Sequence, residues 1–463
     1  MFEAEIYLKR RGRLKEQLKS GLILFLGHEE SPMNYSGNAY YFRQDSSFLY
    51  FFGLDSPSLA GIVDVDENQD ILFGDDVNLD DIIWMGVQPL MKVRASRVGI
   101  EKTEPFSKLD EKIKQAIKDG RTIHYLPPYR AETELKIMKL FDYSYSQIKE
   151  NVSEELIKAV VEQRSVKIKE EIDEIEKAHD LTYAMHTSAM KNAKPNLRES
   201  DLVGKMEGEV ISHGCHTSFP TILTINGQIL HNHYHGNVLK EGRLIVNDSG
   251  AESQMHYAAD ITRTFPVGGK FSDRQKEIYE IVLRAQETAI QNIKPGLKFK
   301  EIHLNAARTI AEGLSDLGLI KGDVNEAVKE GAHSLFFPHG LGHMMGLDVH
   351  DMENLGEDYV GYDEETKRSE QFGLASLRFA KELKPGYVMT VEPGIYFIPA
   401  LIDKWKGENK LPDFIDYEKI EEYRDFGGIR IEDDVEITSN GCRVIGKPIP
   451  KQIEEVEEIT ATE

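Results

Sequence analysis

The sequence predicts an α/β (α+β) protein of two domains, a smaller mixed α/β domain followed by a larger one. Three observations lead to this prediction. The chain has 463 residues, which is more than one average domain holds. In the first third, short apolar runs bounded by glycine alternate with charged, helix-forming stretches. Near residues 150–165 the pattern turns strongly helical, so we expect domains over residues 1–155 and 156–463.

The individual elements follow from hydrophobic periodicity. Residues 21–27 (GLILFLG) are an apolar run between glycines and predict a buried strand, and residues 48–54 (FLYFFGL) and 60–65 (AGIVDV) have the same character. The polar stretch 108–119 predicts a helix. Across residues 164–192, apolar residues recur every two to four positions on a charged background, which predicts one long amphipathic helix. Further helices are expected over 273–292 and 300–318, and the ranges 356–382 and 399–425 resemble insertions between sheet elements.

Composition excludes several classes of function. Lys and Arg total 56 against 79 Asp and Glu, and a net charge of −23 argues against nucleic-acid binding, which needs basic patches. The sequence has no run of 18 apolar residues, so no membrane span is expected. The N-terminus lacks the apolar core of a secretory signal. Two cysteines, Cys215 and Cys442, fit a reducing compartment, although they leave a single bridge open. We therefore expect a cytoplasmic protein with a solvated acidic tail over 454–463.

The first chemical feature is a pair of aspartates in VNDSGAESQMHYAADITRTFPVGG. Asp248 ends an apolar run where a core strand would continue with an apolar residue, and Asp260 begins a second β-like run. A hairpin between the two runs would bring the carboxylates side by side, and burying two like charges is costly unless a cation compensates. A solvated turn is the alternative explanation for this segment taken alone.

Histidines and further acids follow in glycine-rich contexts. The segment HGLGHMMGLDVHD holds His339, His343 and His350 within 12 positions, and imidazole is both a common metal ligand and a proton carrier. In TVEPGIY, Glu392 interrupts an apolar strand. In GGIRIEDDV, alternation would place Arg430, Glu432 and Asp434 on one face of a strand, where a structural ion pair is the alternative reading.

The combined set of two Asp, one His and two Glu points to divalent cations. It has four carboxylates and no sulfur, which suits Mn²⁺, Co²⁺, Zn²⁺ or Fe²⁺. About two divalent ions would balance four carboxylates, and two such ions can activate water and polarise a carbonyl.

With these motifs in view, the chain resembles the pita-bread metallopeptidases of the proline-directed branch, which contains prolidase and aminopeptidase P. The runs DITRTFP, HGLGHMMGLDVHD, TVEPGIY and GGIRIEDDV are similar to the family's motifs in the family's order, and YYFRQDSSFLYFFGL resembles the N-terminal domain of the same branch. The resemblance implies an aminopeptidase-P-like N-terminal domain and a C-terminal pita-bread domain that hydrolyses Xaa-Pro bonds. The interval from Asp248 to Asp260 is one residue longer than the family pattern, which a turn or a bulge would absorb.

Carried over position by position, the resemblance implies the following roles. Two metal ions, most simply Mn²⁺ with Co²⁺ or Zn²⁺ as alternatives, are held by Asp248, Asp260, His343, Glu392 and Glu432, with Asp260 and Glu432 bridging. Glu392 is also the expected proton shuttle. His231, His339 and His350 would contact the substrate and the developing oxyanion, and Arg430 would orient a ligand carboxylate.

Substrate length separates the two closest family members. Prolidase takes dipeptides that end in proline, whereas aminopeptidase P removes the first residue from longer peptides with proline second. A dipeptidase needs a cation for the substrate carboxylate, and Arg378, 14 residues before Glu392, lies where the resemblance places that arginine. We therefore expect an Xaa-Pro dipeptidase, with aminopeptidase P as the alternative and a surface role for Arg378 in that case.

Other expectations concern partners and more distant functions. The expected ligands are small proline-containing peptides, with no nucleic acid and no membrane. A homodimer or homotetramer is expected from the branch. A non-catalytic pita-bread binding protein or a creatinase-like amidinohydrolase is less favoured, because all five ligand positions are filled.

Overall fold

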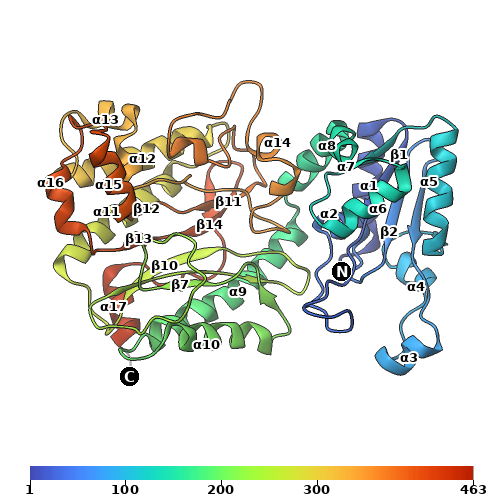
Figure 1. Cartoon of the computed structure of the whole chain (residues 1–463), viewed down its shortest axis with the longest axis horizontal. Coiled ribbons are helices and arrows are strands. Elements are labelled where there is room, and N and C mark those ends of the chain that lie inside the picture. The colour runs from blue at the N-terminus through green and yellow to red at the C-terminus, as the bar shows by residue number, and fades with distance from the viewer. Residues whose placement is uncertain (462–463) are drawn as a thin grey trace. The chain divides into compact units, whose positions relative to one another are not determined.

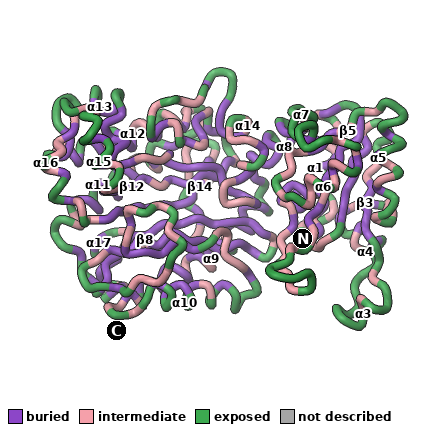
Figure 2. Tube along the Cα trace, viewed as in Figure 1, coloured by how far each residue is buried: buried purple, intermediate pink, exposed green. Residues whose placement is uncertain are grey.

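The structure is a computed structural model that describes residues 1–461. It divides into an N-terminal unit, residues 1–164 with 352–359, and a C-terminal unit, residues 165–351 with 360–463. Figure 1 shows the elements of both units, and Figure 2 shows that the buried residues follow the strands and the inner faces of the helices in each. Within the described residues, no helix is long and apolar enough to cross a membrane.

The N-terminal unit is built on a mixed five-stranded sheet in the order β4-β3-β2-β1-β5. Pairs β1–β5 and β3–β4 are parallel, and β1–β2 and β2–β3 are antiparallel. The strands are β1 (Leu22–Leu26), β2 (Ala60–Asp64), β3 (Gln69–Phe73), β4 (Lys102–Glu104) and β5 (Ile123–Tyr125). The helices are α1 (Ala4–Leu18), α2 (Ser46–Phe52), α3 (Leu79–Met85), α4 (Met91–Ser96), α5 (Leu109–Lys118), α6 (Ala131–Phe141), α7 (Tyr145–Glu150) and α8 (Glu154–Ser165).

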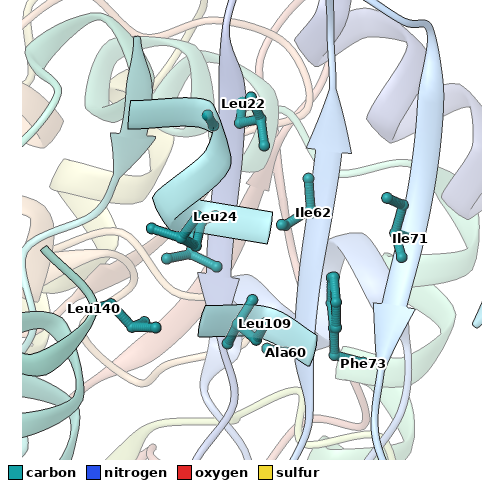
Figure 3. Close-up of a cluster of buried hydrophobic side chains, with 10 residues drawn as sticks. Leu22, Leu24, Ala60, Ile62, Ile71, Phe73, Leu109 and Leu140 are labelled. Atoms are coloured by element: carbon teal, nitrogen blue, oxygen red, sulfur yellow. The ribbon is translucent and has the colours of Figure 1, made fainter. Parts of the chain in front are cut away.

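One face of this sheet packs against α5 and α6. Leu22, Leu24 and Ile62 point from the strands toward Leu109 of α5 and Leu140 of α6, as Figure 3 shows. The strands predicted at residues 21–27 and 60–65 and the helix predicted at 108–119 are thereby confirmed.

The strand predicted at residues 48–54 is wrong, because this run is helix α2. All seven of its residues are buried, so the apolar run shows no helical period. Its ends carry the helix signals: the Asp45 carboxylate accepts the Phe48 N–H (2.8 Å), and Gly53 terminates the helix at φ 61°. A side chain at Gly53 would collide with the Tyr7 ring. Of the aromatic run, Phe48 and its neighbours in the helix are core, whereas Tyr40 and Tyr41 are exposed.

The helix predicted over 164–192 is confirmed from residue 169 onward, whereas its first five residues lie outside it. α8 ends at Ser165 and α9 (Lys169–Asn192) begins after a break of three residues. At the break, the Lys167 N–H donates to the Gly386 carbonyl (2.8 Å), and the Ile168 N–H donates to the Glu171 carboxylate (3.0 Å). A tertiary partner and a local cap therefore replace the helical hydrogen bonds at this point.

The C-terminal unit contains antiparallel sheets in the orders β10-β8-β7, β11-β14-β15, β12-β13 and β6-β9. Its strands are β6 (His216–Thr217), β7 (Ile222–Thr224), β8 (Leu244–Ser249), β9 (Ala251–Glu252), β10 (Ile261–Pro266), β11 (Val388–Val391), β12 (Gly394–Tyr396), β13 (Gly428–Arg430), β14 (Asp433–Ile437) and β15 (Cys442–Val444). α9 packs against β8 and β10, and α11 packs against β11, β12 and β13 (Figure 1).

The helices of this unit include the two predicted after residue 270. Besides α9, the helices of the unit are α10 (Glu199–Ser212), α11 (Asp273–Asn292), α12 (Phe299–Asp316), α13 (Val324–Glu330), α15 (Pro399–Gly407), α16 (Tyr417–Ile420) and α17 (Ile453–Ala461). Helix α14 (Glu357–Gly361) spans the position at which the chain leaves the range of the N-terminal unit. The solvated tail expected over 454–463 is wrong for its described part, because α17 buries Val456 and pairs Glu457 with Lys270 (2.7 Å). Residues 462–463 lie outside the described chain.

Candidate metal centre

Two paired strands bring the first two carboxylates together. β8 and β10 run antiparallel with Asp248 opposite Thr262, so Asp248, Thr262 and Asp260 share one face of the pair. The connecting residues form a turn in which Ser253 N–H donates to the Tyr257 carbonyl (2.8 Å) and His256 adopts φ 66°. This turn accommodates the 12-residue interval, and the pairing stays regular.

The remaining acidic and imidazole groups come from three further segments, each joined to a strand. The His343 N–H donates to the Thr390 hydroxyl (3.1 Å), which holds the histidine segment against β11. β11 leads directly to Glu392. Glu432 lies between β13 and β14, and its N–H donates to the Thr262 carbonyl of β10 (3.0 Å). Four segments that are distant in sequence therefore meet at one place.

The geometry of this cluster fits divalent metal ions. One ligand atom each of Asp260, His343 and Glu432 lie within 4.8 Å of one another. His343 Nε2 lies 3.4 Å from Asp260 Oδ2 and 3.8 Å from Glu392 Oε1. His343 Nδ1 lies 3.0 Å from the Met344 carbonyl and donates to it, so Nε2 presents its lone pair to the carboxylates. Asp248 Oδ1 and Asp260 Oδ1 are buried without a hydrogen-bond partner, which is the environment expected of oxygens that coordinate a cation.

The electrostatics of the acids agree with that fit. Burial raises the pKa of Asp260 well above its ordinary value, and the charges of Glu432 and Asp248 raise it further. Burial raises the pKa of Glu432 in the same way. Burial also raises the pKa of Glu392 to about 8, although the charge of Arg430 opposes this. The raised pKa values favour the protonated form of these carboxylates, and divalent ions would displace such protons.

The surroundings of His231, His339 and His343 favour the neutral imidazole. Burial, followed by the charge of His350, lowers the pKa of His343 well below its usual value. Burial and then Arg430 lower the pKa of His339 to about 3. Burial is also the main cause of the lowered pKa of His231. Neutral imidazole is the form that coordinates a metal ion.

Arg430 ties the cluster to its surroundings. Its guanidinium donates to Asp248 Oδ2 (2.6 Å), to the Thr262 hydroxyl (3.0 Å) and to the Tyr396 hydroxyl (2.8 Å). Thr262 in turn donates to Glu432 Oε2 (2.7 Å). As predicted from the alternation in GGIRIEDDV, Arg430, Glu432 and Asp434 all reach toward β10, and Asp434 accepts the Asp260 N–H (2.9 Å).

A cavity of about 300 Å³ opens onto the cluster. It is lined by every residue that the sequence singled out for the site, namely His231, Asp248, Asp260, His339, His343, His350, Arg378, Glu392, Arg430 and Glu432. Apolar side chains, among them Phe219, Ile222 and Leu230, form part of the wall. The cavity thus combines apolar surface with a few convergent polar groups, as is usual in small-ligand sites.

His339 and Arg378 are each fixed by contacts within the protein. His339 donates from Nδ1 to the Gly340 carbonyl (2.8 Å), and its Nε2 accepts the Tyr396 hydroxyl (2.9 Å). Both ring nitrogens of His339 are therefore engaged within the protein. Arg378 follows a short 3₁₀ turn (Leu374–Ser376), and the preceding carbonyl, that of Leu377, accepts the Tyr362 hydroxyl (2.5 Å).

Several residues of the site are not recognisable from the sequence. Thr262 in DITRTFP and Tyr396 in TVEPGIY carry no charge, so nothing in the sequence distinguishes them from other residues of a strand. His179 on α9 lies 2.9 Å from Asp434, although more than 250 positions separate the two in the chain. Tertiary contact alone connects this helix to the cluster.

Comparisons with known proteins agree with this architecture. Residues 173–439 match metallopeptidase family M24, and residues 7–124 match the aminopeptidase P N-terminal domain. The Xaa-Pro aminopeptidase of Escherichia coli K12 is 31% identical over 462 residues, covering 97% of this chain and 96% of the relative. The Xaa-Pro dipeptidase of Mus musculus is 31% identical over 469 residues, covering 98% and 92%.

Solved structures show the same fold. Escherichia coli aminopeptidase P with the inhibitor Pro-Leu matches with a TM-score of 0.81 at 30% identity, covering 99% of this chain and 98% of that one. The zinc-substituted form of that enzyme with product gives the same values. The predicted combination of an aminopeptidase-P-like N-terminal domain and a pita-bread domain is confirmed. This chain belongs to metallopeptidase family M24, whose chemistry depends on divalent metal ions.

Proposed function

We propose that this chain hydrolyses the peptide bond that precedes proline, and that Xaa-Pro dipeptides are its main substrates. The observation that carries the proposal is the convergence of the Asp-Asp-His-Glu-Glu cluster and Arg378 on one cavity. The names of the relatives, Xaa-Pro aminopeptidase and Xaa-Pro dipeptidase, supply the substrate class.

Two divalent ions would be held by Asp248, Asp260, His343, Glu392 and Glu432. We infer Mn²⁺ as the preferred ion, with Co²⁺ and Zn²⁺ as alternatives, because four carboxylates and one imidazole make an oxygen-rich ligand set. When bound, the ions would activate water and polarise the scissile carbonyl. Arg430 would act as a positioning residue, since its 2.6 Å contact fixes the Asp248 carboxylate.

The proton transfer is assigned to Glu392. Its side chain is 19% exposed, compared with 8% for Asp260 and 5% for His343, so it is the most accessible of the three. As a carboxylate it would take a proton from the attacking water and give it to the proline nitrogen.

The histidines around the cavity would have different tasks. Because both ring nitrogens of His339 are engaged, we assign it to contact with the substrate through the ring rather than to donation toward the oxyanion. His350, whose ring centroid lies 4.2 Å from that of His343, is the proposed oxyanion donor. His231 would contact the substrate from the loop between β7 and β8.

Arg378 is the residue that favours a dipeptide substrate over a longer peptide. It lines the same cavity as the metal-binding cluster, and its positive charge contributes to the lowered pKa of both His231 and His343. An arginine in the same cavity as the proposed metal ligands would pair with the carboxylate of a substrate that ends at proline. The second candidate is an Xaa-Pro aminopeptidase. It is favoured by the match to Escherichia coli aminopeptidase P over nearly the whole of both chains.

The test compares initial rates on Ala-Pro and Ala-Pro-Ala with added Mn²⁺, and again with excess chelator. We expect a preference for the dipeptide that is lost with chelator. We also expect Arg378→Ala to raise KM for Ala-Pro by at least tenfold, whereas Arg284→Ala, an exposed arginine on α11, leaves it unchanged. A preference for the tripeptide would assign the aminopeptidase activity instead. Turnover of neither peptide by protein that binds metal would refute both.

Assembly and location complete the proposal. We infer a homodimer or homotetramer, to be checked by light scattering coupled to size-exclusion chromatography. Both cysteines are free thiols, which agrees with a reducing compartment such as the cytoplasm. We place the boundary between the two domains in the region 150–165.

A further inference from the structure

A histidine outside the cavity lies beneath the metal-binding cluster. His179 projects from α9, and its Nε2 lies 2.9 Å from Asp434 Oδ2. The two side chains are 2% and 0% exposed. Burial raises the pKa of Asp434 and the contact with His179 opposes this, so His179 favours the charged form of the Asp434 carboxylate.

Asp434 passes this contact on to the cluster. The same oxygen, Oδ2, accepts the main-chain N–H of Asp260 at 2.9 Å. Asp260 supplies one of the three ligand atoms that lie within 4.8 Å of one another. One carboxylate oxygen therefore joins a histidine on α9 to the backbone of a proposed metal ligand.

The surroundings of His179 are shaped for an imidazole. Gly446 adopts φ 76°, and a Cβ built on it would lie 2.6 Å from the Cβ of His179. The neighbouring Ile445 N–H donates to the main-chain carbonyl of Asp434 (2.9 Å), which fixes this loop beside the His179–Asp434 contact. A glycine in a left-handed conformation thus leaves the space that the ring fills.

We propose that His179 is a positioning residue of the metal centre, which fixes Asp434 and through it the main chain of Asp260. Asp434 is a carboxylate close to other carboxylates. After burial and nearer charges, its negative charge also raises the pKa of Asp260 and of Glu432. Without His179, the Asp260 amide is the remaining partner of Asp434 Oδ2 among residues 1–461, and repulsion from the neighbouring carboxylates can displace Asp434. The Asp260 carboxylate then loses its fixed position, and the metal site loses affinity. The inference rests on the proposed metal centre but not on the proposed peptide substrate.

The test measures Mn²⁺ binding by titration calorimetry of metal-stripped protein. We expect His179→Leu, which keeps bulk but removes the contact with Asp434, to weaken binding of at least one ion by about 10–100-fold. His179→Gln, whose amide can reach Asp434, should recover most of that affinity. Thr182→Val is the matched control. Thr182 is equally buried one turn away on α9. Its hydroxyl donates to the Ala178 carbonyl and accepts the Ala251 N–H instead of contacting the cluster, so parental affinity is expected.

A folded His179→Leu protein that binds both ions with parental affinity would overturn the inference, as would equal losses in the Leu and Gln variants. If His179→Leu does not fold, Gly446→Ala displaces the same imidazole from the other side and should weaken Mn²⁺ binding, and unchanged binding would again overturn it. Parental protein that binds two ions but cleaves no Xaa-Pro bond would refute the proposed substrate and leave this inference intact.

Discussion

Removing the ammonium group of Lys167 should destabilise the C-terminal unit strongly. Lys167 Nζ lies 2.9 Å from Asp351 Oδ2, and each side chain is 1% exposed. Both groups pack on Gly346, where an added Cβ would lie 2.6 Å from the Asp351 carboxylate and 3.0 Å from the Lys167 stem. The pair therefore lies directly under the segment that carries His343 and His350.

The magnitude follows from burial. Lys167→Met keeps most of the apolar stem but leaves the Asp351 carboxylate buried without its cation, and breaking such a pair costs about 3–5 kcal/mol. With an unfolding entropy of roughly 2.1 cal/mol/K per residue over residues 165–351 and 360–463, 1 kcal/mol corresponds to about 1.6 °C. We expect the melting temperature of this unit to fall by about 5–8 °C.

Calorimetry of metal-free protein measures this shift without interference from bound ions. The double variant Lys167→Met with Asp351→Leu removes both charges, and we expect it to regain most of the lost stability because no ion is left unpaired. Lys169→Met is the matched control, since the Lys169–Asp173 pair is exposed and should contribute less than about 1 kcal/mol. A Lys167→Met protein with a parental melting temperature would refute the reasoning.

Three further predictions concern the acids and the N-terminal unit. Metal-free protein should lose stability relative to metal-free Glu392→Gln protein as the pH rises from about 4.5 to about 8 in urea unfolding, because folded Glu392 keeps a proton that the unfolded chain has lost. Equal pH profiles of the two proteins would contradict the assigned pKa. Glu392→Gln should lower kcat by about 10²–10⁴-fold while dipeptide binding persists, and near-parental turnover in stopped assays would exclude it as the proton carrier. Arg11→Met should destabilise the N-terminal unit by about 3–5 kcal/mol, because the buried carbonyls of Phe51 and Val98 lose their donor and Asp70 keeps only Lys15 (2.9 Å) of its two cations, yet Mn²⁺ affinity measured by calorimetry should not change.

Local sequence was a good guide where an element's pattern is set by its own residues. The strands at β1 and β2 and the helices α5 and α11 lie where periodicity and glycine boundaries predicted them. Helix α2 was misread because its seven residues are all buried, which removes the alternation between apolar and polar faces that separates a helix from a strand. The break between α8 and α9 was missed for a different reason. Its cause is the carbonyl of Gly386, more than 200 positions away.

The chemistry of the site was readable because charged residues in apolar, glycine-rich strands are costly and therefore conspicuous. Asp248, His343 and Glu392 stood out in this way, and the order of the four motifs indicated the family. The neutral partners Thr262 and Tyr396 gave no such signal, because hydroxyl side chains are common in strands and turns.

The sequence by itself therefore determined the ligand types, the family and most of the secondary structure. Only the tertiary structure decided which atoms meet. It placed Arg378 in the wall of the cavity, engaged both nitrogens of His339, and buried the contacts of His179 with Asp434 and of Lys167 with Asp351. The physical reason is that burial and distance set the strength of a charge interaction, and both depend on elements that are packed together from distant parts of the chain.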